Sequence, residues 1–250
     1  MARTWVLGHR GDSAHAPENT LAAFEAAFRA GADGIELDTM LSADGVPVVI
    51  HDAWLQRTTG VPGSVFLSTV ADLKKLDAGA WFSDKFRGER IPTLAEALDL
   101  GRNRGIVNVE IKSPKQVPFA RTTDAVLRVI DTWAHPEQIV VSSFDPRIVA
   151  RVHRRAPWLK TGFLRSYTQR GPWRSIAWLA GADWMHVDAP LAEVASRSRT
   201  PERVVVWTVD HPTEIARLAA EGVRAIVTNV PGTARAVVDS LRARRTGVMP

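Results

Sequence analysis

Short apolar segments rich in β-branched residues alternate with amphipathic segments along the chain, at intervals of about 25 to 30 residues. This alternation is typical of parallel strands joined by helical crossovers. The apolar segments predict strands over 4–8, 34–38, 47–51, 106–112, 138–143, 160–164, 183–187, 204–209 and 225–228. The amphipathic segments predict helices over 19–30, 93–103, 119–133, 145–155, 173–181, 212–221 and 231–244.

The length of the chain narrows the choice of architecture. An α/β barrel of eight strands needs about 250 residues, and this chain has 250. We therefore expect a single domain, residues 1–250, with a TIM-type (β/α)8 barrel. The predicted strands number nine, one more than such a barrel holds. Either one segment is not a barrel strand, or the pair within 34–51, whose turn at 42–45 leaves no room for a helix, distorts the repeat.

Helix signals support these bounds. Asn19 or Thr20 can cap the first helix, and Gly31 stands where a left-handed residue would end it. Thr93 with Glu96 three residues later has capping-box spacing.

Residues 52–92 follow neither the strand nor the helix pattern, apart from a short helical stretch near 68–76. The segment begins directly after His51 and is rich in aromatic residues. We expect it to form a small cap over the barrel mouth, where Trp81 and Phe82 would contact the alcohol half of a substrate. The alternative is that these rings pack the insertion against the barrel.

Composition excludes several classes of protein. The chain has no cysteine, so disulfide scaffolds, thiolate zinc sites and cysteine nucleophiles are excluded. The net charge of +5 is compatible with an anionic ligand but mild for a nucleic-acid binder, so we expect no nucleic-acid partner. No apolar stretch near the N-terminus is long enough for a signal peptide or a membrane span, so we expect a cytoplasmic protein without stable membrane insertion.

Catalytic residues of an α/β barrel lie at the C-terminal ends of its strands. The first four predicted strands end in charged or titratable residues, namely His9 and Arg10, Glu36 and Asp38, His51, and Glu110 and Lys112. Residues two apart on a strand share a face, so the three carboxylates should converge inside the mouth. Because unpaired carboxylates repel one another there, they predict one hard divalent cation, Mg²⁺ or Ca²⁺, with Mn²⁺ as a further candidate. The competing interpretation is that these acids only pair with Arg10 and Lys112.

The histidines and cations complete a site for phosphoryl chemistry. His9 and His51 would face one substrate from two sides and divide the roles of general acid and general base. Arg10 and Lys112 would supply fixed positive charge for an anion. Trp207 at a strand end would form an apolar wall for the ligand, with core packing as the alternative. For His186 the sequence favours neither the mouth nor the core.

Eleven motifs, in order along nearly the whole chain, resemble the glycerophosphodiester phosphodiesterase family: His9-Arg10-Gly11, Pro17-Glu18-Asn19-Thr20, Glu36-Leu37-Asp38, Asp44 to Asp52, Arg57 to Gly60, Trp81-Phe82, Ile91 to Leu94, Asn108 to Lys112, Ser142-Ser143-Phe144, Val206 to Val209 and Thr228-Asn229. The resemblance implies a TIM-type barrel that cleaves glycerophosphodiesters, such as glycerophosphocholine or glycerophosphoethanolamine, to glycerol 3-phosphate and an alcohol in glycerophospholipid catabolism. It implies the roles already assigned from the residues: Glu36, Asp38 and Glu110 as metal ligands, His9 and His51 as acid and base, and Arg10 and Lys112 as phosphate contacts.

Two positions depart from the family pattern. Asn229 stands where Asp is more frequent, and Asp210 stands where Asn is more frequent. Both lie outside the expected catalytic set, so we expect them to affect only details of the pocket. Two other functions stay open: a lysophospholipase D-like activity at the same site, and a non-catalytic barrel that binds phosphodiesters.

Overall fold

The computed structural model describes residues 3–133, 135–169, 171–192 and 200–246. Nine strands are seen there: β1 Trp5–His9, β2 Gly34–Leu41, β3 Pro47–Val49, β4 Ile106–Ile111, β5 Ile139–Ser143, β6 Lys160–Arg165, β7 Trp184–Asp188, β8 Val204–Trp207 and β9 Ala225–Thr228. Eight of them form a closed parallel ring, because β1 pairs with both β2 and β9. The predicted barrel is therefore confirmed.

The predicted strand in excess of eight is β3. It lies outside the ring and pairs antiparallel with the end of β2. The physical reason is the short turn between them. Ser42 Oγ accepts a hydrogen bond from the Val46 N–H at 2.9 Å, and Gly45 adopts φ 83°. Such a tight turn can only reverse the chain, since a parallel neighbour needs a long crossover.

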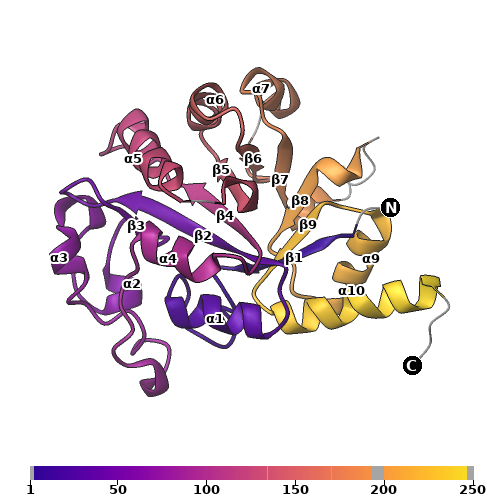
Figure 1. Ribbon diagram of the computed structural model, residues 1–250, viewed down its shortest axis with the longest axis horizontal. Helices are drawn as coiled ribbons and strands as arrows, with labels where there is room; N and C mark the ends of the chain where they lie inside the picture. Colours follow the sequence, from indigo (N-terminus) through magenta and orange to yellow (C-terminus); the bar gives the residue numbers. More distant parts are fainter. Residues whose placement is uncertain (1–2, 134, 170, 193–199, 247–250) are drawn as a thin grey trace.

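Helices surround the ring (Figure 1). Their bounds are α1 Leu21–Arg29, α2 Gln56–Thr59, α3 Val70–Leu73, α4 Leu94–Gly101, α5 Phe119–Asp131, α6 Pro146–Arg155, α7 Trp173–Leu179, α9 Pro212–Glu221 and α10 Pro231–Thr246, with 3₁₀ turns at Val65–Leu67, Asp84–Phe86, Pro136–Gln138, Ala189–Leu191 and Pro201–Arg203. Thr20 caps α1 and Thr93 forms the predicted capping box with Glu96. Within the described ranges, no helix is both long and apolar enough to cross a bilayer.

Apolar side chains occupy the barrel interior near the N-terminal ends of its strands. The interior cluster contains Leu7, Val205, Ala225 and Val227, with Trp5 and Trp184 packed against it. The Trp5 and Trp184 rings meet edge to face at 5.7 Å between centroids. This packing leaves the C-terminal ends of the strands as the place for a polar site.

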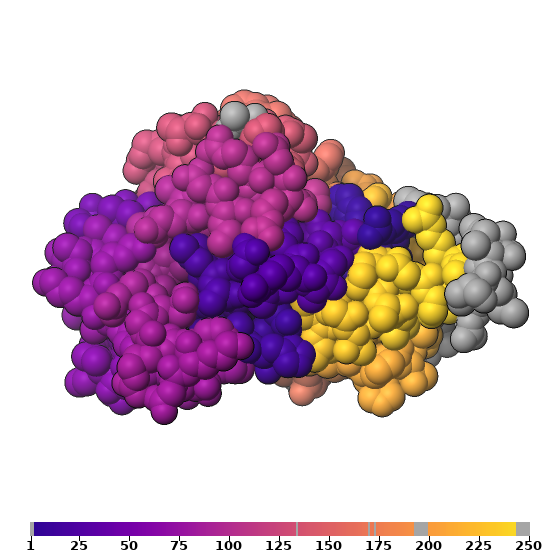
Figure 2. Space-filling view, turned by 60° about the horizontal axis from the view of Figure 1, so that its bottom comes forward, coloured from indigo at the N-terminus to yellow at the C-terminus, as the bar shows by residue number. Residues whose placement is uncertain are grey.

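The segment between β3 and α4 is the part of the chain that we expected to form a cap over the barrel mouth. It carries α2 and α3 and lies to one side of the barrel beside β3 (Figure 1). Figure 2 shows the same part of the chain, in purple, as a lobe next to the indigo N-terminal part. Its own small core is shared with β2 and β3 and contains Met40, Val48, Ile50, Leu55, Val65, Leu73, Ala78 and Ile91. The insertion is thus anchored on the hairpin that leaves the ring.

Candidate active site

A cavity of about 170 Å³ opens at the C-terminal ends of the barrel strands. Its lining consists of His9, Arg10, Glu36, His51, Asn108, Glu110, Lys112, Ser142, Phe144, Leu164, His186, Trp207 and Val227. A larger hollow of about 470 Å³ lies between α6, α7 and β7, but none of the predicted site residues lines it. Seven of the ten predicted site residues line the smaller cavity, whereas Asp38, Trp81 and Phe82 do not.

The cavity has two unlike sides. The charged side comes from β1, β2, β4 and the end of β3, and its charged or titratable cavity-lining residues are His9, Arg10, Glu36, His51, Glu110 and Lys112, with the neutral Asn108 beside them on β4. The neutral side comes from β5 to β8, and its cavity-lining residues are Ser142, Phe144, Leu164, His186 and Trp207.

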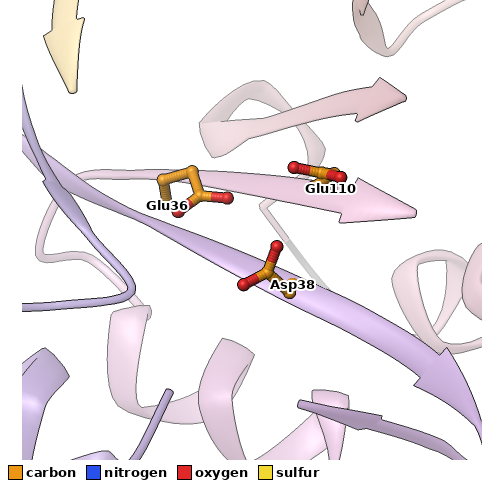
Figure 3. A group of neighbouring side chains, drawn as sticks. All are labelled: Glu36, Asp38 and Glu110. Carbon is orange, nitrogen blue, oxygen red and sulfur yellow. The ribbon is translucent and has the colours of Figure 1, made fainter. Parts of the chain in front are cut away.

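Three buried carboxylates meet on the charged side. Asp38 and Glu110 are register partners on β2 and β4, and Glu36 precedes Asp38 on the same face of β2. Figure 3 shows the three side chains facing one common space. One oxygen from each lies within 4.8 Å of the others, so the group could hold a metal ion. Carboxylate oxygens are the ligands that Mg²⁺ and Ca²⁺ prefer.

Ion pairs satisfy only part of this group. Lys112 Nζ lies 2.8 Å from Asp38 and 2.6 Å from Glu110, and Arg10 Nε lies 3.1 Å from Asp38. Glu36 accepts a hydrogen bond from the Arg10 backbone N–H at 3.1 Å, and no ion pair to Glu36 is seen in the described part of the chain. The interpretation that these acids merely pair with the two cations therefore leaves Glu36 unexplained.

The electrostatics of the three acids differ accordingly. Burial, followed by the charges of Asp38 and Glu110, raises the pKa of Glu36 well above its ordinary value. Burial also raises the pKa of Glu110. Burial opposes ionisation of Asp38 too, but its ion pairs with Lys112 and Arg10 lower the pKa of that carboxyl. A divalent cation would favour the ionised form of all three, so the residues fit a metal site.

Asn19 orients Asp38 and was not predicted as a site residue. Its side-chain amide donates to Asp38 Oδ2 at 2.8 Å, and its side-chain carbonyl accepts from the Asp38 N–H at 3.2 Å. Asn19 has φ 57°, a left-handed conformation that Asn tolerates better than most residues. Thr20, and not Asn19, caps α1. Because Asn19 also fitted the pattern of a helix cap, its contact with Asp38 was not predicted.

His9 is held by a pair of polar residues from the end of the chain. Its Nδ1 lies 2.7 Å from Asn229 Oδ1, and the Asn229 side-chain N–H donates to Asp210 at 2.7 Å. This arrangement makes Asn229 Oδ1 an acceptor, so Nδ1 carries the proton and Nε2 is left as the basic nitrogen. Burial, followed by the Arg10 charge, lowers the pKa of His9 to about 4.

The two departures from the family pattern are therefore partners in one contact. Asp210 accepts from the Thr228 hydroxyl at 2.9 Å and from the Asn229 backbone N–H at 2.8 Å, besides the side-chain amide. One carboxylate and one amide are present in either order, so the exchange preserves the pairing. Asn229, which we expected to lie outside the catalytic set, contacts His9 directly.

His51 is linked to Arg10 through a chain of charged groups. Its Nδ1 lies 2.6 Å from Asp52, and Arg57 Nε donates to the same carboxylate at 2.5 Å. Arg57 also donates twice to Glu18, at 2.7 Å each. Glu18 in turn accepts from Arg10 Nη1 at 2.9 Å. Burial lowers the pKa of His51, although Asp38 and Asp52 oppose this.

Sequence reasoning quoted Glu18, Asp52 and Arg57 only as parts of motifs. Asp52 directly follows the predicted histidine, which was the available signal for its contact. Arg57 comes from α2, so the insertion contributes to the site through this guanidinium.

The predicted aromatic contacts differ in outcome. Trp207 lines the cavity on the neutral side and meets Phe144 edge to face, with 5.6 Å between centroids. Trp81 and Phe82 do not line it. The Trp81 indole N–H donates to the Ala78 carbonyl at 2.9 Å, and its ring packs on Phe82 at 5.7 Å. The structure thus brings Trp207, but not these two rings, to the cavity.

The chain is similar in sequence and in fold to known phosphodiesterases. A sequence model of the Glycerophosphoryl diester phosphodiesterase family matches residues 9–233. The glycerophosphodiester phosphodiesterase of Caldanaerobacter subterraneus subsp. tengcongensis is 39% identical over 236 residues, covering 92% of this chain and 96% of the relative. An Oleispira antarctica phosphodiesterase, solved with the product sn-glycerol-3-phosphate, has a TM-score of 0.87 at 28% identity, covering 95% of this chain and 97% of that one. The glycerophosphodiester phosphodiesterase of Thermotoga maritima has a TM-score of 0.74 at 29% identity, covering 93% and 97%.

Proposed function

The chain belongs to the glycerophosphoryl diester phosphodiesterase family and is a phosphodiesterase of that family, and on this premise we propose a metal-dependent, two-histidine reaction. Its substrates would be glycerophosphodiesters such as glycerophosphocholine or glycerophosphoethanolamine, and its products glycerol 3-phosphate and an alcohol. The observation that carries this proposal is the convergence of two histidines, two cations and two carboxylates at one cavity, with Asp38 beside these carboxylates.

Arg10 and Lys112 would hold the phosphate. Each donates several N–H groups, and each stays protonated because Asp38 raises its pKa although burial opposes this. Glu36, Asp38 and Glu110 would hold Mg²⁺ or Ca²⁺, with Mn²⁺ as a further candidate. When bound, such an ion supplies positive charge for a non-bridging phosphate oxygen and a hydroxyl of the glyceryl group. The two side-chain cations would balance the charge that develops in the transition state.

The surroundings of the two histidines support opposite roles. His9 presents an unprotonated Nε2, because Nδ1 donates to Asn229, so it is suited to remove a proton from the attacking oxygen. His51 has Asp52 at its Nδ1 and Asp38 nearby, and both carboxylates oppose the lowering of its pKa by burial, Lys112 and Arg10. It is therefore suited to protonate the leaving alcohol. The attacking oxygen belongs either to water or to the substrate's own glycerol 2-hydroxyl, which would give a cyclic phosphate.

The decisive experiment is a coupled assay for glycerol 3-phosphate release, with and without chelator, across several head groups. Phosphorus NMR of the reaction separates the two attacking oxygens, because only the intramolecular route passes through a cyclic phosphate. A lysophospholipase D-like activity would favour a lysolipid over glycerophosphocholine in the same assay. A non-catalytic barrel would release no product, but the seven intact residues argue against it. The cytoplasmic location stays a prediction.

A further inference from the structure

The cavity contains buried polar atoms that the protein itself leaves without hydrogen-bond partners. Within the described residues, four such atoms are neutral and belong to cavity-lining side chains: Asn108 Oδ1, Ser142 Oγ, His186 Nε2 and Trp207 Nε1. We call these four residues the polar floor. Arg10 Nε and Glu110 Oε1 also lack a well-directed hydrogen bond, but each lies within 3.1 Å of an opposite charge and needs no further partner.

Three members of the polar floor are more than nine-tenths buried. The exposed fractions are 2% for Asn108, 0% for Ser142 and 1% for His186. They sit on different strands, β4, β5 and β7, and line the same cavity. Buried polar groups of folded proteins almost always have a partner, so a ligand in this cavity is the natural source of the missing ones.

His186 has its place because Gly162 has no side chain. A Cβ at Gly162 would lie 2.3 Å from His186 Nε2, far inside van der Waals contact. Burial lowers the pKa of His186 to about 3, so the imidazole is neutral near pH 7. A neutral imidazole offers one N–H donor and one acceptor nitrogen, and it brings no charge to the neutral side.

The mixture of donors and acceptors indicates the chemistry of the ligand. Asn108 Oδ1 can only accept, Trp207 Nε1 can only donate, and Ser142 and His186 can do either. A hydroxyl group donates and accepts at once, so it can satisfy both kinds. A quaternary ammonium head group offers neither an N–H nor a lone pair. The polar floor therefore suits a hydroxyl-bearing part of the substrate.

We propose that the polar floor recognises the terminal hydroxyl of the substrate's glyceryl group, with His186 and Ser142 as specificity-determining residues. The proposal rests on the proposed function, which places the phosphate at Arg10 and Lys112 on the charged side. The terminal hydroxyl is the polar group of the glyceryl moiety farthest from phosphorus, so with the phosphate on the charged side it is the group best placed to reach across the cavity to the polar floor. The cavity, about 170 Å³, is of a size for such a small moiety.

The test compares glycerol 3-phosphate with propane-1,2-diol 1-phosphate, which lacks only the terminal hydroxyl. Competitive inhibition and calorimetry give the affinity of each for the wild-type protein, His186→Leu and Ser142→Ala. The wild type should prefer glycerol 3-phosphate by about 10- to 100-fold, the range for losing the partner of buried polar groups. Each variant should lose most of that preference, mainly through weaker binding of glycerol 3-phosphate. The phosphocholine diesters of the same two ligands both keep the 2-hydroxyl. Their kcat/KM values should show the same preference in the wild type and the same loss of preference in each variant.

Thr161→Val is the matched control. It removes a buried hydroxyl from β6 that bonds to Asp183 and does not line the cavity, so the preference should stay that of the wild type. Equal losses on both ligands in the two floor variants would overturn the proposal and leave buried water as the partner of these atoms. Ser142→Ala removes a single oxygen and serves if His186→Leu does not fold. Absence of turnover would reject the proposed function, whereas the calorimetric preference tests the polar floor separately.

Discussion

The charged and neutral sides of the cavity are built by strands of the same ring, yet they are held in different ways. On the charged side, most functional groups contact another charged or polar side chain, as in the chain from His51 through Asp52, Arg57 and Glu18 to Arg10, while among the described residues Glu36 accepts only from a backbone N–H. On the neutral side, Ser142, His186 and Trp207 keep polar atoms without partners.

This difference indicates a division of work. Groups that must carry charge in a buried place need partners to stay ionised, and on the charged side ion pairs within the protein supply part of them. Neutral polar groups cost less free energy to bury than charged groups, so they can lack a hydrogen-bond partner until a ligand binds. We expect the charged side to control the rate of the reaction and the neutral side to control which substrate is accepted.

Removing the metal should have the largest effect of any change on the charged side. Excess chelator should abolish turnover, and Mg²⁺, Ca²⁺ or Mn²⁺ should restore it. Glu110→Gln removes a ligand charge without much volume, so kcat/KM should fall roughly 10²- to 10³-fold while the melting temperature is kept. Glu202→Gln, at an exposed position, is the control. Full activity in excess chelator would reject the metal site.

Loss of either histidine that we propose as general acid or base should have the next largest effect. His9→Ala and His51→Ala should each lower kcat by about 10² to 10⁴, as expected for a general acid or base. The pH profile of kcat/KM should be bell-shaped if both proton transfers limit the rate. Exposed His211 at the start of α9 provides the control variant His211→Ala. Near wild-type turnover in either active-site variant would remove that histidine from the mechanism.

Arg57 tests whether the insertion supports the charged side. Arg57→Ala leaves Asp52 and Glu18 without their shared cation, so His51 and Arg10 both lose a fixed neighbour. We expect kcat/KM to fall about 10- to 100-fold, mainly through kcat. Arg57→Lys should recover only part of this activity, because a lysine cannot bond to both carboxylates as a guanidinium does. Arg87→Ala, which breaks an exposed ion pair of the same insertion, should leave kcat/KM unchanged. An effect on KM alone would show that Arg57 does not position His51.

Exchanging Asn229 and Asp210 should change the pH dependence more than the rate. In the double variant Asn229→Asp/Asp210→Asn, a carboxylate replaces the amide oxygen that accepts from His9 Nδ1. A carboxylate stabilises the imidazolium, so the pKa of His9 should rise from about 4 toward its ordinary value. The acid limb of kcat/KM reports loss of neutral His9, so it should move to higher pH by about 1 to 2 units. Asp210→Asn alone should leave the limb in place, and an unmoved limb in the double variant would contradict the role of His9 as base.

The barrel and the charged side were predictable because both follow short sequence rules. Strand and helix periodicity located the strands of the ring, and strand parity placed Glu36 and Asp38 on one face. The extra strand could be counted but not placed, because pairing of β3 outside the ring depends on which edge of β2 is free. The contact of Asn229 with His9 joins residues 220 positions apart, and no local pattern reports such a contact.

The neutral side was less visible in the sequence for a chemical reason. Ser142 and His186 lie within largely apolar strands, where an occasional polar residue is common in any core. Their significance comes from the missing partners, which only the three-dimensional arrangement reveals. The role of Gly162 could not be predicted from the sequence either, since this residue acts by leaving space for the His186 side chain.

The smallest effects should come from the aromatic rings of the insertion. The prediction that Trp81 and Phe82 contact the leaving alcohol concerns a part of the substrate that extends beyond the small cavity. If it is right, Trp81→Ala or Phe82→Ala should change kcat/KM a few-fold and unequally among choline, ethanolamine and glycerol head groups, with metal dependence unchanged, because a pocket contact worth about one methylene discriminates only modestly. Trp207→Ala, inside the cavity, should instead lower kcat/KM on every head group.

Packing predicts a different result for the same variants. Trp81 packs on Phe82, and Phe82 packs on Phe86, so truncation of either ring would loosen the insertion and lower the melting temperature. Because Arg57 belongs to that insertion, a loosened segment would slow the reaction equally for every head group. Trp158→Ala, an exposed ring far along the chain before β6, controls for the loss of an indole as such. Unequal effects at an unchanged melting temperature would place these rings in recognition, and equal effects with a lower melting temperature would confine them to packing.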